Sequence, residues 1–210
     1  GGCVVKLRTA LAPVLTAVAA AGLLASSPAA QGTDADRFWP QWRGPDMTGV
    51  SRHADPPVEW SETRNIRWKT EIPGRGSASP VIWGDRVFLL TAVPTGASPD
   101  ASHAPLGGVQ PRRAHQFVVL AIDRRDGRLV WQRTAREETP HEASHADNGT
   151  WASSSAITDG RHVFAYFESR GLLAYDMDGT LAWEKDLGDK LMRNQFGEGS
   201  TPVLYGDRLV

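Results

Sequence analysis

Apolar positions in the chain come in short runs that alternate with polar turns. Three stretches share one design: small hydroxyl residues, an apolar run, a Gly- and Asp-containing turn, Arg and a second apolar run. They are "SASPVIWGDRVFLL", "SSSAITDGRHVFAYF" and "GSTPVLYGDRLV", which begin at Ser77, Ser153 and Gly199. Short apolar runs on either side of such a turn are typical of β-hairpins. Each stretch therefore predicts two antiparallel strands.

A second kind of hairpin follows the first two stretches. "VLAIDRRDGRLVWQR" and "LLAYDMDGTLAWEKD" both contain an apolar run, Asp, a turn with Gly and a strand that carries Trp. Trp68, in "NIRWKTEI", holds the same place in an earlier strand. Each unit thus contains four short strands, called A to D in chain order. Arg161 and Arg208 hold equivalent places 47 residues apart (208 − 161), and four strands per unit of this length are typical of a β-propeller blade.

The pattern predicts an all-β chain that forms part of a β-propeller. We expect about two four-stranded antiparallel blades and the start of a third within residues 61–210. Propellers close with about four to eight blades, so we interpret the chain as a fragment of a seven- or eight-bladed propeller. An open array of this kind leaves an edge strand that favours association.

The first 60 residues differ from the repeats. Lys6 and Arg8 precede an uncharged apolar run, and small residues follow it at "SSPAA", which predicts a signal peptide over residues 1–29. A membrane anchor is the alternative, but the run is short for a span of about 20 residues and Pro13 interrupts it. We therefore expect a periplasmic, secreted or cell-surface protein with no membrane span after signal removal. Residues 30–60 are expected to form an extended N-terminal arm whose tryptophans pack on the blades.

The hairpins with Trp resemble a known repeat. The spacing A-x-D-x-x-D-G-x-x-x-W, which ends at Trp131, is similar to the tryptophan-docking repeat of quinoprotein propellers, with Asp126 in place of the usual Thr. "FWPQWRGPDMTGVS" and "RNQFGEGSTPVLYGD" also resemble exported bacterial PQQ-binding-like β-propeller repeat proteins. The resemblance covers residues 38–210. In such a repeat the Asp accepts hydrogen bonds, the Gly adopts an angle closed to other residues and the Trp packs on the neighbouring blade. The expected blade-docking residues are Trp68, Asp123, Gly127, Trp131, Asp176, Gly179 and Trp183.

Long loops fall on one face of the predicted propeller. In antiparallel blades the B–C and D–A connections lie on the same side, and residues 92–116, 134–150 and 187–198 are all connections of these kinds. Long loops on a rigid scaffold commonly carry binding sites, so we expect a protein or small-molecule ligand there. The alternative is that the polar side chains only solvate the loops. The candidate residues for this face are His103, His115, Arg193, Asn194 and Gln195.

One of these loops contains the sequence H-E-x-x-H. His141, Glu142 and His145 match the pattern of zinc proteases, which requires a helix that turns both histidines to one side. Pro140 precedes the motif and Gly149 follows it closely, so a loop is predicted instead. A loop metal site formed by His141, His145 and Asp147 remains an alternative.

Charge and composition narrow the function classes. The formal net charge is −1 and the charges are mixed along the chain, so no basic stripe indicates nucleic-acid binding. A non-catalytic binding or scaffold module is the favoured class, and the loop metal site is another. The resemblance also implies a PQQ-dependent dehydrogenase, in which PQQ lies on a Trp, often under a vicinal disulfide, with Ca²⁺ held by Glu, Asn and Asp. The only cysteine here is Cys3, and those ligands would have to lie in other blades.

Overall fold

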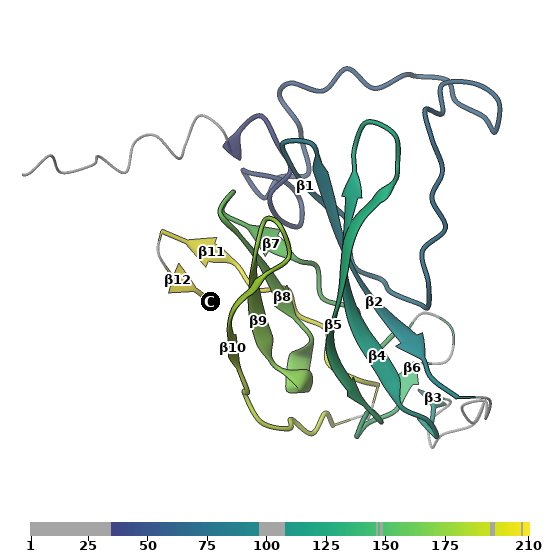
Figure 1. Ribbon diagram of the computed structural model, residues 1–210, viewed down its shortest axis with the longest axis vertical. Helices are drawn as coiled ribbons and strands as arrows, with labels where there is room; N and C mark the ends of the chain where they lie inside the picture. Colours follow the sequence, from purple (N-terminus) through teal and green to yellow (C-terminus); the bar gives the residue numbers. More distant parts are fainter. Residues whose placement is uncertain (1–34, 97–107, 146, 148, 194–195, 207) are drawn as a thin grey trace, which may run out of the picture.

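The fold consists of successive antiparallel β-sheets (Figure 1). The computed structural model describes residues 35–96, 108–145, 147, 149–193, 196–206 and 208–210. Two sheets have four strands each, in the orders β1-β2-β4-β5 and β10-β9-β8-β7, so each sheet follows chain order from one edge to the other. The predicted all-β fold with four-stranded antiparallel blades is confirmed.

The first blade contains the longest strands. Strands β2 and β4 pair along their whole length, from Arg86↔Asp123 to Pro94↔His115. Because β4 also pairs with β5 as far as Glu138, the loops on this side begin later than the predicted 92–116 and 134–150. The strands are β1 (Val81–Trp83), β2 (Arg86–Pro94), β4 (His115–Asp123) and β5 (Leu129–Glu138).

The second blade is shorter and is followed by a third hairpin. The short 3-10 helix η3 (Glu168–Arg170) forms the turn between β8 and β9. A separate pair of short strands, β3 and β6, joins two loops. The bounds are β7 (Ile157–Thr158), β8 (His162–Tyr166), β9 (Leu172–Asp176), β10 (Leu181–Lys185), β11 (Leu204–Tyr205), β12 (Arg208–Leu209), β3 (Gly108–Val109) and β6 (Ser144–His145).

The core lies between the two blades. Strand β4 has the sequence HQFVVLAID and is buried at nearly every position because both of its faces are covered. Strand β5, at the outer edge of its blade, is mostly exposed but turns Trp131 and Ala135 inward. Phe117 of the first blade and Phe167 of the second meet edge to face with ring centroids 5.6 Å apart. Burial of such aromatic pairs holds the faces of neighbouring blades together.

Hydrogen bonds between the blades repeat with one spacing. The indole Nε1 of Trp131 donates to the carbonyl of Met177 at 3.0 Å. Arg133 Nε donates to the carbonyl of Gly179 at 2.7 Å, and the backbone N–H of Ser155 donates to Thr201 Oγ1 at 3.1 Å. Each bond joins residues 46 positions apart. These bonds fix β5 against the C–D turn of the second blade, and the start of the second blade against the third hairpin.

Each indole also lies against a glycine of the following blade. A Cβ added to Gly179 would lie 2.8 Å from a ring carbon of Trp131, and one added to Gly127 would lie 2.6 Å from Trp68. Both glycines have positive φ angles, +85° and +76°. Trp68 Nε1 donates to the carbonyl of Arg124 at 2.9 Å, in the same way that Trp131 bonds to the second blade. The C–D turn of each blade thus offers the preceding Trp a carbonyl and a flat backbone surface.

The aspartates that begin these turns have different surroundings. Asp123 Oδ1 accepts hydrogen bonds from the backbone N–H of Arg125 at 2.8 Å and from its Nε at 3.0 Å. These bonds hold the pKa of Asp123 well below its usual range. Asp176 is half exposed and lies 3.6 Å from His162. The main chain closes both turns in the same way: the carbonyl of Asp123 accepts the N–H of Gly127 at 2.8 Å, and that of Asp176 accepts the N–H of Gly179 at 2.9 Å.

The N-terminal segment crosses the inner edges of both blades. Trp39 forms an isolated antiparallel bridge with Ile82 of β1, and the carbonyl of Pro40 accepts the N–H of Thr158 at 2.9 Å. Trp42 and Trp60 are 48% and 69% exposed. The expectation that all three tryptophans of this segment pack on the blades is therefore wrong for Trp42 and Trp60, because backbone pairing anchors the segment at Trp39.

Gly179→Ala tests the close approach of the indole. Any alanine at positive φ costs about 1 kcal/mol of stability, and the clash with Trp131 adds roughly 1–3 kcal/mol. Gly188→Ala is the matched control, because Gly188 has φ +72° and nothing lies within 4 Å of an added Cβ. Urea unfolding followed by circular dichroism should give the larger loss for Gly179→Ala. Equal losses would show that the indole exerts no steric demand there.

Candidate functional site

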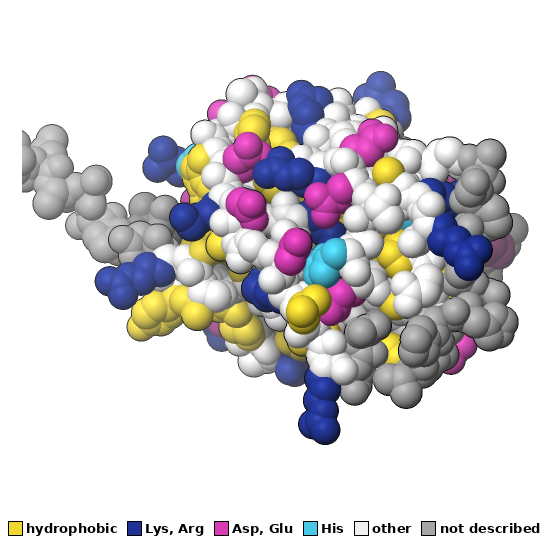
Figure 2. Space-filling view, turned by 90° about the horizontal axis from the view of Figure 1, so that it is seen from below, with side chains coloured by type: hydrophobic (Ala, Val, Ile, Leu, Met, Phe, Trp, Pro, Cys, Tyr) yellow, Lys and Arg dark blue, Asp and Glu magenta, His cyan; other side chains and the backbone are white. Residues whose placement is uncertain are grey.

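Long connections of the two blades meet in one layer at the lower end of the molecule (Figure 1). β3, in the B–C connection of the first blade, pairs with β6, in its D–A connection, through Gly108↔His145 and Val109↔Ser144. The B–C turn of the second blade, η3, lies at the same end. We call the layer formed by residues 108–114, 139–145, 167–171 and 186–193 the loop face. Figure 2 shows acidic and basic side chains interspersed on this side of the molecule.

The first half of the H-E-x-x-H motif ties two loops together. His141 Nε2 donates to the carbonyl of Lys190 at 2.8 Å. Glu142 is buried, and its Oε1 accepts the backbone N–H of Met192 at 2.6 Å. The Glu142 carbonyl also accepts the indole N–H of Trp151 at 3.0 Å. His141 and Glu142 therefore fasten the second D–A loop to the first.

The second histidine of the motif has other neighbours. His145 lies in β6, and its ring meets the ring of Phe196 edge to face at 5.1 Å. His145 Nδ1 accepts the backbone N–H of Asp147 at 3.3 Å. Among the described residues, no three His, Cys, Asp or Glu side chains gather as metal ligands. The structure does not bring His141, His145 and Asp147 together as a metal site, because the motif spans a loop and a strand instead of a helix.

Of the other residues predicted for this face, one is buried, one is exposed and three lie outside the described part of the chain. His115 is only 3% exposed, because it begins the central strand β4 and its ring packs on Trp151 at 4.5 Å. Arg193 is exposed on the second D–A loop. His103, Asn194 and Gln195 lie outside the described residues.

A buried acid in η3 is the feature that the sequence analysis missed. Glu168 is 2% exposed and has a φ of +63°, which few residues other than Gly adopt. Burial, together with the nearby carboxylate of Glu198, raises the pKa of Glu168 to about 8. Ser154 Oγ, which donates to the carbonyl of Ser200 at 2.5 Å, lies 3.4 Å from Glu168 Oε1. The only signal in the sequence is the charged "ESR" between two apolar strands.

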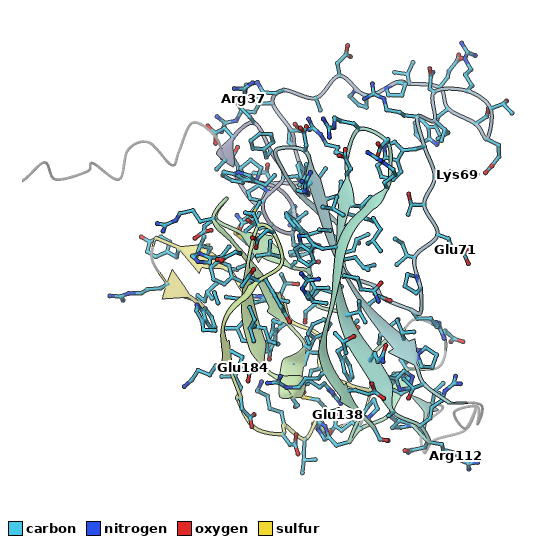
Figure 3. All side chains as sticks on the ribbon, in the orientation of Figure 1. Arg37, Lys69, Glu71, Arg112, Glu138 and Glu184 are labelled. Carbon is cyan, nitrogen blue, oxygen red and sulfur yellow. The ribbon has the colours of Figure 1, made fainter. Side chains whose placement is uncertain are left out.

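The neighbours of Glu168 link the loops of both blades. Arg170 lies 5.2 Å above the ring of Phe117, with its Nε 3.3 Å from Glu138 Oε1. Figure 3 places Glu138 at the lower end of the molecule, where β5 ends. Glu198 accepts hydrogen bonds from the backbone N–H of Ser169 at 2.9 Å and from its hydroxyl. These buried charges are paired across separate segments, so they hold the loop face in one arrangement.

The described residues do not fit the quinone and calcium site that the resemblance implies. Ca²⁺ requires six to eight oxygen ligands, and no cluster of three metal-binding side chains occurs in the described ranges. A vicinal disulfide requires two adjacent cysteines, whereas the sequence contains only Cys3.

Successive four-stranded antiparallel sheets joined by equivalent contacts define the β-propeller class. The chain belongs to the family described as outer membrane protein assembly factor BamB, whose family model matches residues 50–187 and 115–210. Overlapping matches are expected where one repeat aligns in more than one register. The resemblance to PQQ-like repeat proteins is thus confirmed. No curated protein matches the chain. In the part of the chain that the structure describes, no helix has the length and apolar character needed to cross a membrane.

The pKa of Glu168 predicts how stability depends on pH. The folded chain keeps a proton on Glu168 up to about pH 8, whereas the unfolded chain releases it near the ordinary value of 4.5. The free energy of unfolding should therefore decrease as the pH rises from the unfolded-state pKa to the folded-state pKa. The slope in this window is up to roughly 1.4 kcal/mol per pH unit. Glu168→Gln should remove this dependence and unfold less readily than the wild type at alkaline pH.

Urea unfolding at several pH values across this window measures the effect. Glu62→Gln is the control, because the side chain of Glu62 is 82% exposed. Parallel pH profiles for wild type and Glu168→Gln would contradict the raised pKa.

Proposed function

We propose that this protein is an exported, non-catalytic binding or scaffold module that holds its partner on the loop face. The observation that carries the proposal is the interlocking of separate connections into one layer. Strand pairing joins β3 to β6, and the bonds of His141 and Glu142 to the second D–A loop join the two blades. Loops fixed in this way on a rigid scaffold lose little freedom when a partner binds.

The blade contacts supply the rigid scaffold for this role. We assign Trp68, Trp131 and Trp183 to the tryptophan-docking positions of the repeat. The contacts of Trp68 with Gly127 and of Trp131 with Gly179 support this assignment. Trp183 holds the equivalent position on β10, where it is 41% exposed.

Export is the second part of the proposal. Residues 1–29 have the charge and apolar pattern of a signal peptide, and the description of the matched family names the outer membrane. By this analogy the partner would be another protein of the cell envelope. The analogy suggests the compartment in which the partner would be found and does not identify the partner.

Site-specific photo-cross-linking in the native host tests which face holds the partner. A photoreactive side chain is placed at Leu191 on the loop face, which is 86% exposed. The control position is Arg128, in a C–D turn of the opposite face, with a side chain that is 78% exposed. We expect a discrete cross-linked envelope protein from Leu191 and none from Arg128.

Equal cross-linking from both faces would contradict the assignment of the face. Quinone absorbance together with alcohol or sugar oxidation by the native protein would contradict the non-catalytic role.

A further inference from the structure

A separate cavity opens at the side of the loop face, beneath the end of β2. Its volume is about 410 Å³, within the range of small-ligand sites. Three parts of the chain form it: the segment before β1, the end of the β2–β4 hairpin and the segment that follows β6. Its lining comprises Gly74, Arg75, Ala92, Pro94, Val109, Arg113, His115, Ser144, Gly149, Thr150 and Trp151.

The charged and titratable groups among the described lining residues are basic. Arg75, Arg113 and His115 line the cavity, and the described part of the lining contains no Asp or Glu. Asp147 lines an adjoining hollow together with Arg75. No described residue forms a hydrogen bond or ion pair with the guanidinium of Arg75. A guanidinium presents parallel N–H groups that match the two oxygens of a carboxylate.

The backbone holds Arg75 at the mouth of this cavity. Its N–H donates to the carbonyl of Ala92 at 3.0 Å, and its carbonyl accepts the N–H of Ala92 at 2.9 Å. The neighbouring Gly74 has φ +74°, and a Cβ there would lie 2.3 Å from the carbonyl oxygen of Ala92. The main chain around Arg75 is therefore fixed, and only its side chain has to be ordered when a ligand binds.

Two aromatic rings that pack on each other form another part of the lining. The rings of His115 and Trp151 lie 4.5 Å apart. His115 Nδ1 lies 3.1 Å from the carbonyl of Arg113, which can only accept, so Nδ1 carries the proton. The indole N–H of Trp151 is bonded to the carbonyl of Glu142. Ser144 and Thr150 also line the cavity. The aromatic pair suits a ligand with an apolar or ring-shaped body.

We propose that this cavity binds a small organic carboxylate, with Arg75 paired to the carboxylate and the ligand body against Trp151 and Pro94. The inference rests on the proposed binding function and specifies one class of ligand for it. Arg113 contributes positive charge at the same mouth while its Nη1 donates to the carbonyl of Gly96 at 3.4 Å. An inorganic anion would use the arginines and leave the apolar wall without contact, so the cavity should prefer an organic acid.

Titration of the ¹⁵N-labelled chain with acetate, benzoate and glucuronate tests this inference. We expect at least one of the two larger acids to bind saturably, to shift the indole N–H signal of Trp151 and to bind more tightly than acetate. Arg75→Gln should weaken that binding by about 10- to 100-fold, as expected for loss of a charge-assisted pair. Arg75→Lys should retain part of it. Arg161→Gln is the control, because Arg161 is exposed in an A–B turn on the opposite face.

Three results would overturn the carboxylate site. They are the absence of saturable binding by all three acids, equal binding of inorganic phosphate or of the neutral glucuronamide, and unchanged affinity in a folded Arg75→Gln variant. If any of these occurs while Leu191 still yields its cross-linked partner, the loop face remains the binding surface and only the carboxylate site is wrong. Loss of the Leu191 cross-link with the acid site intact would contradict the proposed scaffold role alone.

Discussion

The contact of an indole ring with a glycine across a blade junction is the constraint on which the rest of the structure depends. The Trp131 ring lies on the main chain of Gly179 and donates its N–H to Met177. The same ring also meets Tyr175 of the second blade at 6.2 Å. One side chain therefore supplies apolar area, a hydrogen bond and a steric limit at once. Arg133 adds a second hydrogen bond to the same turn, at the carbonyl of Gly179, so β5 is held to the second blade at two points.

The loop face follows from this attachment of one blade to the next. Phe117 and Phe167 meet only when the blades are correctly aligned, and Arg170 of the second blade then lies over Phe117 of the first. Arg170 also pairs with Glu138 at the end of β5, and a buried charge that loses its partner is strongly destabilising. The loops therefore keep their arrangement as long as the blades stay aligned. The carboxylate cavity is built differently, since Arg75 is positioned by a backbone bridge to Ala92 within the first blade. A ligand in this cavity and a partner at Leu191 would thus bind to the same face at two sites that are stabilised by different contacts.

Much of the fold could be predicted because its determinants are local and repeated. Alternating apolar runs, Gly-containing turns and a Trp at a fixed place specify a blade without knowledge of distant contacts. The buried Glu168 could not be predicted in this way, because its environment comes from Ser154 and Glu198, far away in the sequence. His115 was expected on a loop, but the β2–β4–β5 ladder extends further than the turn residues indicate. The H-E-x-x-H motif was predicted to be a loop from its flanking Pro140 and Gly149, whereas its role in fastening the loops depends on Lys190 and Met192.

The central claim is that the tryptophans stabilise the protein through the neighbouring blade. Trp131 and Trp183 allow a matched test, because each ring lies 5.9 Å from a Phe of its own blade at the same 42° angle. Of these two rings, Trp131 lies against the C–D turn of the next blade, at Gly179 and Met177, whereas no described glycine or carbonyl makes the equivalent contact with Trp183. Urea unfolding of Trp131→Phe and Trp183→Phe, each in the chain without residues 1–29, measures the difference. We expect the free energy of unfolding to fall by about 2–3 kcal/mol for Trp131→Phe and by less than about 1 kcal/mol for Trp183→Phe. Equal losses would contradict the central claim.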